Sequence, residues 1–541
     1  MMGKKTGHAP LMEALIRYRD KGNASFHVPG HKNGQVYEHE DIASLLQEVM
    51  SIDATEITGL DDLHYPEDVI REGQELAAKC FGAEESFWLV GGSTVGNLAM
   101  ILTVCTKPGD LLLVQRNVHK SVLNGLMLSG ATAVFLEPEI DTLSGLAVAP
   151  STDTVKAALK AYPSAKGVLL TLPNYYGMGY ELETTARACH AAHVPLLVDE
   201  AHGAHYGLHP RLPASALSCG ADVVVQSTHK MLPAMTMGAM LHVQGERVHR
   251  ELLRQRLAMV QSSSPSYPLM ASLDLARWHI DVHGEDAFTE GLAAVDAFRK
   301  GLEQLPRFRL VEPTQQVVHG EDAHKDSSEG LEKDGERTSG YSTQDPFKIV
   351  LYDTLGVLDG FGLKHELETY GCIPEMSDEK HVVLLFTLGS TARDASHLLQ
   401  AFVHINNDIR FKKTAGELCS MGMEQHGLDL DFSTWNNDRM TAYSNPVQFG
   451  LQPINPEQIE VVPVEDSVGR VAAEMIIPYP PGIPLLYAGE KITEANALRM
   501  RRLRDLGAKW QGVADESMLT IRVFRLEYRL DTRDLTTNTE G

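Results

Sequence analysis

The sequence lacks any apolar run long enough to span a membrane, and its first residues, "MMGKKTGHAP", carry no apolar stretch typical of a signal peptide. Only 6 of its 541 residues are cysteine, and they are scattered without CxxC or metal-ligand spacing. We therefore expect reduced structural thiols, a cytoplasmic location and no membrane partner.

Positive charge is also scarce. The chain has 48 lysines and arginines against 72 aspartates and glutamates, a formal net charge of −24. Nucleic acids and anionic membranes would repel such a chain at long range, so we expect neither as a partner. The acidic balance favours a solvated surface and does not hinder a cationic small-molecule substrate.

The apolar residues are arranged as in a large α/β protein. A length of 541 residues predicts two or more domains. Between residues 75 and 245, short apolar runs such as "LLLVQR" and "ADVVVQ" alternate with helical patterns. This alternation predicts a mainly parallel sheet flanked by helices.

One stretch, residues 319–346, is polar and charged and predicts a linker or insertion. A solvated loop is the favoured interpretation there, ahead of a docking segment for a partner. We predict an N-terminal segment packed on the large domain (1–70), a cofactor-binding large domain (71–318) and a smaller α+β domain (347–541).

In α/β sheets ligands bind outside the carboxyl ends of the strands, so the residues after each apolar run are candidates for chemistry. "GGSTVGN" offers backbone N–H groups and the hydroxyls of Ser93 and Thr94 to a phosphate, or is a glycine turn with a Ser or Thr helix cap. After the next run, His119 could stack on an aromatic ligand or be a hydrogen-bonded loop residue.

Acidic residues follow a third apolar run. Asp199 and Glu200 come directly after "VPLLV", and His202 and His205 follow. One carboxylate here could keep a heterocyclic nitrogen protonated, or could cap a helix or form a surface salt bridge. A metal site is disfavoured because no thiol or further ligand cluster accompanies these residues, and we predict no metal.

A lysine follows the fourth run. Lys230 ends "QSTHK", beside Ser227, Thr228 and His229. A lysine near a buried site loses its proton readily and can form a Schiff base, although a lone lysine is more often a surface residue. Phosphate turn, histidine, carboxylate and lysine in this order meet the requirements of pyridoxal 5′-phosphate (PLP).

The residues and the order of these motifs resemble those of the Orn/Lys/Arg decarboxylase family of PLP enzymes, which have the aspartate aminotransferase type of fold (fold type I). It resembles the shorter Gram-positive members, without the amino-terminal wing domain of the long forms. The matching segments are "FHVPGHKNG", "TEITGLDDLHYPEDVI", "GGSTVGN", "NVHKS", "LLVDEAHGAH", "QSTHKML", "SSSPSYPLMASLD", "IPEMSDEKHVVLLFTLG" and "PYPPGIPLLYAGEKIT". "HYPEDVI" departs from the family pattern because no glycine follows the proline-acid pair.

The resemblance implies four catalytic residues. Lys230 would hold the cofactor covalently, and His229 beside it would be a possible proton donor. His119 would stack on the cofactor ring, and Asp199 would pair with the pyridine nitrogen.

The resemblance also implies further cofactor contacts. Ser93, Thr94 and Ser227 would hold the phosphate, and His202 would lie near the ring. Ser262 would reach the phosphate of a neighbouring subunit, so the active sites would be shared in a homodimer or a higher homo-oligomer.

The implied reaction is decarboxylation of arginine, lysine or ornithine, with arginine or lysine preferred. It consumes a proton, which suits both acid resistance and polyamine biosynthesis. Glu375 is a candidate for the distal cation of the substrate, or is a structural or solvent-facing residue. The alternatives are an aminotransferase, an aldolase, or a catalytically silent PLP-binding regulatory homologue.

Overall fold

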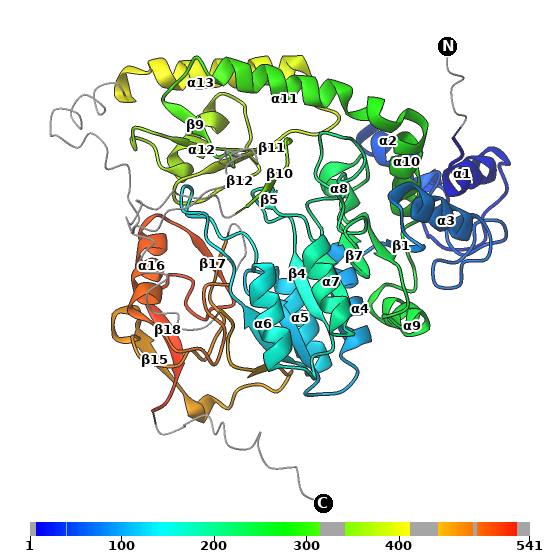
Figure 1. Cartoon of the computed structure of the whole chain (residues 1–541). Coiled ribbons are helices and arrows are strands. Elements are labelled where there is room, and N and C mark those ends of the chain that lie inside the picture. Colours follow the sequence, from blue (N-terminus) through cyan, green and yellow to red (C-terminus); the bar gives the residue numbers. More distant parts are fainter. Residues whose placement is uncertain (1–6, 39–40, 314–340, 412–441, 480–483, 527–541) are drawn as a thin grey trace, which may run out of the picture.

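An eight-stranded sheet forms the centre of the computed structural model, which describes residues 7–38, 41–313, 341–411, 442–479 and 484–526 (Figure 1). Five strands pair in parallel, β8 is antiparallel to both β7 and β1, and β14 is antiparallel to β3. In spatial order the strands are β1 (Glu85–Leu89), β8 (Ala239–Val243), β7 (Val223–Gln226), β6 (Leu196–Asp199), β4 (Val168–Thr171), β2 (Leu111–Gln115), β3 (Thr132–Leu136) and β14 (Val447–Gln448). The predicted α/β class with a mainly parallel sheet is confirmed.

Two apolar cores cover the two faces of this sheet, because successive strand residues point to opposite sides. Val224 belongs to one core, and its neighbour Val225 belongs to the other. The flanking helices are α3 (Val69–Phe81), α4 (Gly92–Val104), α5 (Lys120–Ser129), α6 (Thr152–Ala161), α7 (Glu183–Ala191), α8 (Thr228–Met231), α9 (Arg250–Val260) and α10 (Tyr267–His283).

Helix α4 lies very close to the sheet. A Cβ atom added at Gly96 would come within 2.4 Å of Val225 Cγ2, so only glycine allows this approach. The start of α4 also needs glycine, because Gly92 has a φ of +74°. These two positions bring the first turn of α4 to the carboxyl end of the neighbouring strands.

A second, antiparallel sheet of four strands lies beside the first. Its order is β12 (Met376–Ser377), β13 (Val382–Leu385), β11 (Lys348–Asp353) and β9 (Phe308–Leu310). The accompanying helices are η3 (Gly284–Phe288), α11 (Thr289–Leu302), α12 (Gly360–Thr369) and α13 (Ala392–Asn407), and α11 and α13 run side by side (Figure 1).

A short strand pair links the two sheets. β10 (Thr343–Gln344) pairs with β5 (Met178–Gly179), and this contact brings the start of β11 towards the carboxyl edge of the large sheet. β9 precedes the polar stretch 319–346 and β11 follows it, while residues 319–340 lie outside the described residues. The division of the chain at this stretch therefore stays a prediction.

A third group of elements, near the C-terminus, has its own small apolar core. Arg116 connects it to the large sheet, because its guanidinium pairs with Glu490 and its carbonyl accepts a hydrogen bond from the Tyr487 hydroxyl. This α+β part contains η4 (Pro456–Gln458), β15 (Ile459–Pro463), η5 (Val464–Asp466), β16 (Ile477–Tyr479), α16 (Glu494–Asp505), β17 (Lys509–Gln511) and β18 (Thr520–Phe524).

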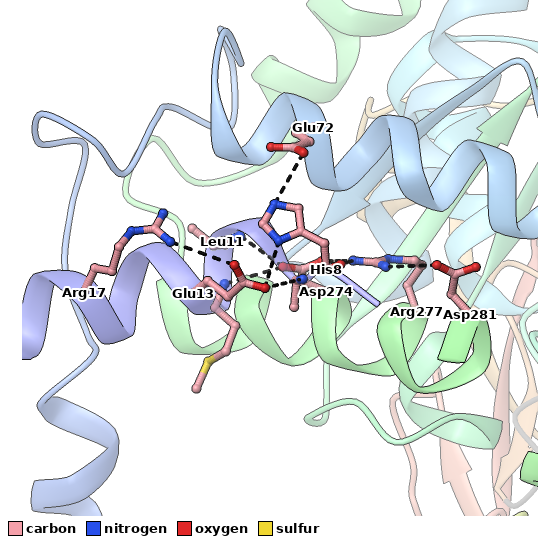
Figure 2. A network of polar contacts seen from close by, with 10 residues as sticks. His8, Leu11, Glu13, Arg17, Glu72, Asp274, Arg277 and Asp281 are labelled. Carbon is pink, nitrogen blue, oxygen red and sulfur yellow. Dashed lines mark hydrogen bonds and ion pairs between the residues drawn. The ribbon is translucent and has the colours of Figure 1, made fainter. Parts of the chain in front are cut away.

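The N-terminal helix α1 (Pro10–Asp20) is attached to α10 by a buried carboxylate (Figure 2). Asp274 accepts hydrogen bonds from the backbone N–H groups of Leu11, at 3.0 Å, and Met12, at 3.4 Å. Its other oxygen lies 2.5 Å from Arg277 Nη2. The carboxylate thus satisfies two N–H groups that a helix start leaves without a partner.

Three short helices follow α1: η1 (Gln35–Tyr37), η2 (Asp41–Ala43) and α2 (Ser44–Met50). Several of the apolar side chains in this segment are exposed, including Phe26, Ile42 and Leu45. Within the described ranges, no helix combines the length and the apolar character needed to cross a bilayer.

Candidate active site

The carboxyl ends of four strands bring most of the predicted residues to one edge of the large sheet. β1 has the same direction as β7, because both pair antiparallel with β8 between them. Ser93 therefore follows β1 at the same edge where His119 follows β2, Asp199 ends β6 and Lys230 follows β7. This edge is where α/β sheets bind their ligands.

The predicted anion-binding turn is built from the start of α4 and the end of β7. Ser227 Oγ donates a hydrogen bond of 2.8 Å to Ser93 Oγ. Gly91 precedes α4 at the N-cap and no side chain caps the helix, so the alternative interpretation of Ser93 or Thr94 as the cap is wrong. The exposed Thr94 and half-buried Ser93 stay in the first turn, where hydroxyls and N–H groups suit a phosphate.

Asp199 is held by a network that also includes His119. Asn97 Nδ2 donates to Asp199 Oδ2 and to Ser121 Oγ, each at 2.8 Å. Ser121 in turn contacts His119 Nδ1 through its hydroxyl, at 2.8 Å, and through its backbone N–H, at 3.2 Å. A nitrogen that accepts from a backbone N–H carries no proton, so the neutral ring of His119 has its proton on Nε2.

Burial lowers the pKa of His119 below its usual value, and the charge of Asp199 only partly reverses this effect. The two contacts at Nδ1 fix the orientation of this neutral imidazole ring, and such a ring is suited to stack on a heterocycle.

The surroundings of Asp199 suit the ring nitrogen of PLP. The side chain is 2% exposed, and its oxygens accept from Asn97 and from the Ala201 N–H. Among the described residues no cationic side chain forms an ion pair with it. Burying a charge without a partner is costly, and the protonated ring nitrogen of PLP is a cation of the right kind to compensate it.

Lys230 is the amine of this site. Its Nζ lies 3.0 Å from His202 Nε2. Burial lowers the pKa of Lys230, while the carboxylates of Asp199 and Glu375 raise it in part. A lysine with a lowered pKa is a better nucleophile at neutral pH, as Schiff-base formation requires.

His229 precedes Lys230 on α8, and its ring contacts the backbone through Nδ1. Its Nδ1 lies 2.9 Å from the carbonyl oxygen of Gly238, and a carbonyl can only accept, so Nδ1 carries the proton. Nε2 is left as the position at which this histidine can gain or release a proton.

Two predicted residues are not brought into contact with this group. Ser262 is exposed, and its backbone carbonyl accepts from His64 Nε2 at 2.9 Å. Glu375 is also exposed, but its charge raises the pKa of both Lys230 and Lys348. The roles of both residues stay predictions.

Glu200 and His205, which lie near Asp199 in the sequence, form hydrogen bonds with residues outside this group. Glu200 accepts from Gln226 Nε2 at 2.7 Å, and burial raises its pKa to about 8. His205 Nε2 lies 3.1 Å from Asp345 Oδ1. In the described part of the chain, no group of three or more His, Cys, Asp or Glu side chains could hold a metal ion.

Several residues of the site were not predicted from the sequence. Asn97 and Ser121 were inside quoted motifs, but nothing in the pattern showed that they connect Asp199 to His119. Tyr175, whose ring centroid is 4.8 Å from that of His202, carried no signal. Lys348 did carry one, because it opens an otherwise apolar strand, "KIVLYD".

Comparison with known families agrees with this geometry. Residues 9–394 match the model of the Orn/Lys/Arg decarboxylase major domain, and residues 438–512 match that of the family's C-terminal domain. The chain belongs to the Orn/Lys/Arg decarboxylase family. Enzymes of this family depend on PLP, and the predicted resemblance is confirmed.

Two relatives of this decarboxylase family match nearly the whole chain. The uncharacterized protein YaaO of Bacillus subtilis is 38% identical, over 93% of this chain and 96% of the relative. The arginine decarboxylase of Halalkalibacterium halodurans is 33% identical, over 95% and 97% of the two chains.

The decarboxylase fold is also shared with a solved structure. The constitutive lysine decarboxylase of Escherichia coli superposes with a TM-score of 0.70 and 22% identity, covering 96% of this chain and 82% of that one. Together with the matched C-terminal domain, this likeness confirms the predicted fold class.

Proposed function

We propose that the chain is a PLP-dependent decarboxylase that converts a basic amino acid, arginine, lysine or ornithine, to the corresponding amine and carbon dioxide. The observation that carries the proposal is the meeting of a half-buried amine with a lowered pKa, Lys230, and a buried carboxylate that forms no ion pair with a cation of the described residues, Asp199, at one edge of the sheet. Members of the family share this type of reaction.

The site residues divide the binding of PLP between them. Ser93, Thr94 and Ser227 would hold the phosphate, and Asp199 the ring nitrogen. His119 would lie against the ring, and the amine of Lys230 would bind the aldehyde carbon. When bound, PLP supplies an electron sink for the electrons of the bond to the carboxyl group.

The chain's own contribution includes the proton that the reaction consumes. Replacing carbon dioxide by hydrogen at the α-carbon requires a nearby proton donor. Lys230 and His229 are adjacent on α8, and no hydrogen bond within the described residues involves His229 Nε2. His202, Asp199 and Ser227 are buried and thus shielded from bulk water, whereas His229 and Lys230 are half-buried.

Glu375 is our candidate for binding the distal cation of the substrate. Its carboxylate is exposed, yet its charge acts on both Lys230 and Lys348, which places it within electrostatic reach of the site. The Halalkalibacterium relative makes arginine the first substrate to test.

We also propose a homodimer with shared active sites. Phe26, Ile42 and Leu45 are 94%, 97% and 84% exposed, and exposed apolar groups of this kind are typical of an interface. A second copy that covers this N-terminal segment would bury them. Ser262 is exposed in the single chain and is therefore available to the neighbouring subunit.

The test is reconstitution with PLP followed by product analysis. We expect a visible absorption band, and borohydride reduction followed by mass spectrometry should place the PLP label on Lys230. Lys230→Ala should lose the band, whereas Lys364→Ala, at a surface ion pair on α12, should keep it.

The products separate the proposed activity from its alternatives. One amine and carbon dioxide from arginine, lysine or ornithine support the decarboxylase. Keto-acid formation would indicate an aminotransferase, and a band with no product from any amino acid would indicate a regulatory homologue.

A further inference from the structure

Asn97 is a buried side-chain amide to which the proposed reaction gives no role. It is 0% exposed and lies on α4 directly after Gly96, whose missing side chain lets this helix approach β7. The close approach brings the amide to the edge of the sheet where Asp199 ends β6. Asn97 is therefore part of the candidate site by position.

The contacts of Asn97 fix the direction in which its amide faces. Its Nδ2 lies 2.8 Å from Asp199 Oδ2 and 2.8 Å from Ser121 Oγ. An ionised carboxylate has no proton to donate, so the group that faces Asp199 must be the N–H donor. Both hydrogens of the amide nitrogen are then used, one in each contact, and the side chain cannot turn without losing both.

The other end of the amide has no such contact. Within the described residues, Asn97 Oδ1 is buried and accepts no hydrogen bond. A buried acceptor without a partner is unfavourable, and an apolar side chain of similar shape would avoid this cost. What asparagine adds at this position is therefore the pair of donated hydrogen bonds.

Asp199 receives few hydrogen bonds for a buried charge. Its side chain is 2% exposed, and two N–H groups of the described residues donate to it: Asn97 Nδ2, at 2.8 Å, and the backbone of Ala201, at 3.1 Å. A hydrogen bond donated to a carboxylate stabilises its ionised form and makes it a weaker base. Asn97 supplies the shorter of these two contacts.

We propose that Asn97 is a positioning residue that acts through Asp199 and keeps the shared proton on the ring nitrogen of bound PLP. The ring nitrogen and the Asp199 carboxylate compete for one proton, which stays on the stronger base. Because Asn97 weakens the carboxylate as a base, the proton stays on the ring, where its charge strengthens the electron sink. Without this donor the proton moves from the ring nitrogen to Asp199, and no other bond changes. This role rests on the proposed function, in which the chain binds PLP.

The test reads the ring nitrogen directly and does not use catalytic activity. The chain is loaded with PLP that carries isotopically labelled nitrogen in its ring, and solid-state NMR at constant pH locates the signal between the positions of protonated and neutral pyridine. We expect the wild-type signal at the protonated position. Asn97→Leu keeps a side chain of similar size without the donor. Losing one hydrogen bond to a charged group should shift the proton about 10- to 100-fold towards Asp199, and the signal towards neutral pyridine.

Two controls separate this role from a structural one. Gln244 is also a side-chain amide that donates twice, to the carbonyls of Leu217 and Ala221, but it follows β8 at the opposite edge of the sheet. Gln244→Leu should leave the signal at its wild-type position. In Asp199→Asn the ring nitrogen has lost its carboxylate, so adding Asn97→Leu to this variant should cause no further shift.

A wild-type signal at the neutral position, or an unchanged signal in Asn97→Leu, would overturn the proposal. An equal shift on adding Asn97→Leu to Asp199→Asn would also overturn it, because Asn97 would then not act through Asp199. If Asn97→Leu does not fold, Asn97→Ala decides by the same criterion. A wild-type chain that binds no PLP would overturn the proposed function and this inference together, whereas bound PLP with an unchanged signal overturns this inference alone.

Discussion

Replacing Asp199 by asparagine removes one charge and almost no volume. The side chain is 2% exposed and accepts hydrogen bonds from Asn97, at 2.8 Å, and Ala201, at 3.1 Å. Its charge is the proposed partner of the PLP ring nitrogen. Breaking a buried charge pair costs about 3–5 kcal/mol, which corresponds to a decrease in kcat of about 10²- to 10⁴-fold.

The assay for Asp199→Asn combines kcat, from the rate of carbon dioxide release, with PLP affinity, from titration of the visible band. Asp222→Asn is a matched control, because Asp222 is equally buried but lies at the opposite end of β7, paired with His190 and Arg247. The control should lower thermal stability and leave PLP affinity unchanged. Wild-type kcat and PLP affinity in Asp199→Asn would refute the assigned role.

Three further predictions concern stability. Gly96→Ala should lower the free energy of unfolding in urea by about 1–3 kcal/mol, because the new methyl group meets Val225; an unchanged value would contradict the close packing of α4. The folded chain keeps a proton on Glu200 up to a pH of about 8, whereas the usual pKa is 4.5, so stability should fall as pH rises through this window. Glu200→Gln should therefore gain stability relative to wild type from pH 5 to pH 8 in thermal melts, and a constant difference would refute the raised pKa. Asp274→Asn removes the buried carboxylate 2.5 Å from Arg277 and leaves the 3.9 Å contact with Asp281, so trypsin should cleave α1 faster than in wild type; equal cleavage rates would show that the carboxylate does not hold this helix.

The sequence predicted the fold class and the strand ends of the site because both follow from local periodicity. Short apolar runs mark buried strands, and the residues after them, such as His119, Asp199 and Lys230, meet at one edge of a parallel sheet. The antiparallel direction of β8 was not visible in the sequence, because a fully buried strand is equally apolar in either direction.

The contacts between site residues could not be predicted in the same way. The Asn97 side chain joins Asp199 and Ser121 across 102 and 24 positions of the chain. Lys348 comes from a different sheet and reaches His202 because β10 pairs with β5. Such contacts depend on how separate elements pack, and no local pattern encodes that packing.

The central claim is that Lys230 makes this chain a decarboxylase of a basic amino acid. The most direct measurement is the release of labelled carbon dioxide from carboxyl-labelled arginine, lysine and ornithine, each tested separately with the PLP-reconstituted chain and with Lys230→Ala. We predict release from one of the three by the wild-type chain and none by the variant. Bound PLP with no release from any of the three, or equal release by both proteins, would contradict the account.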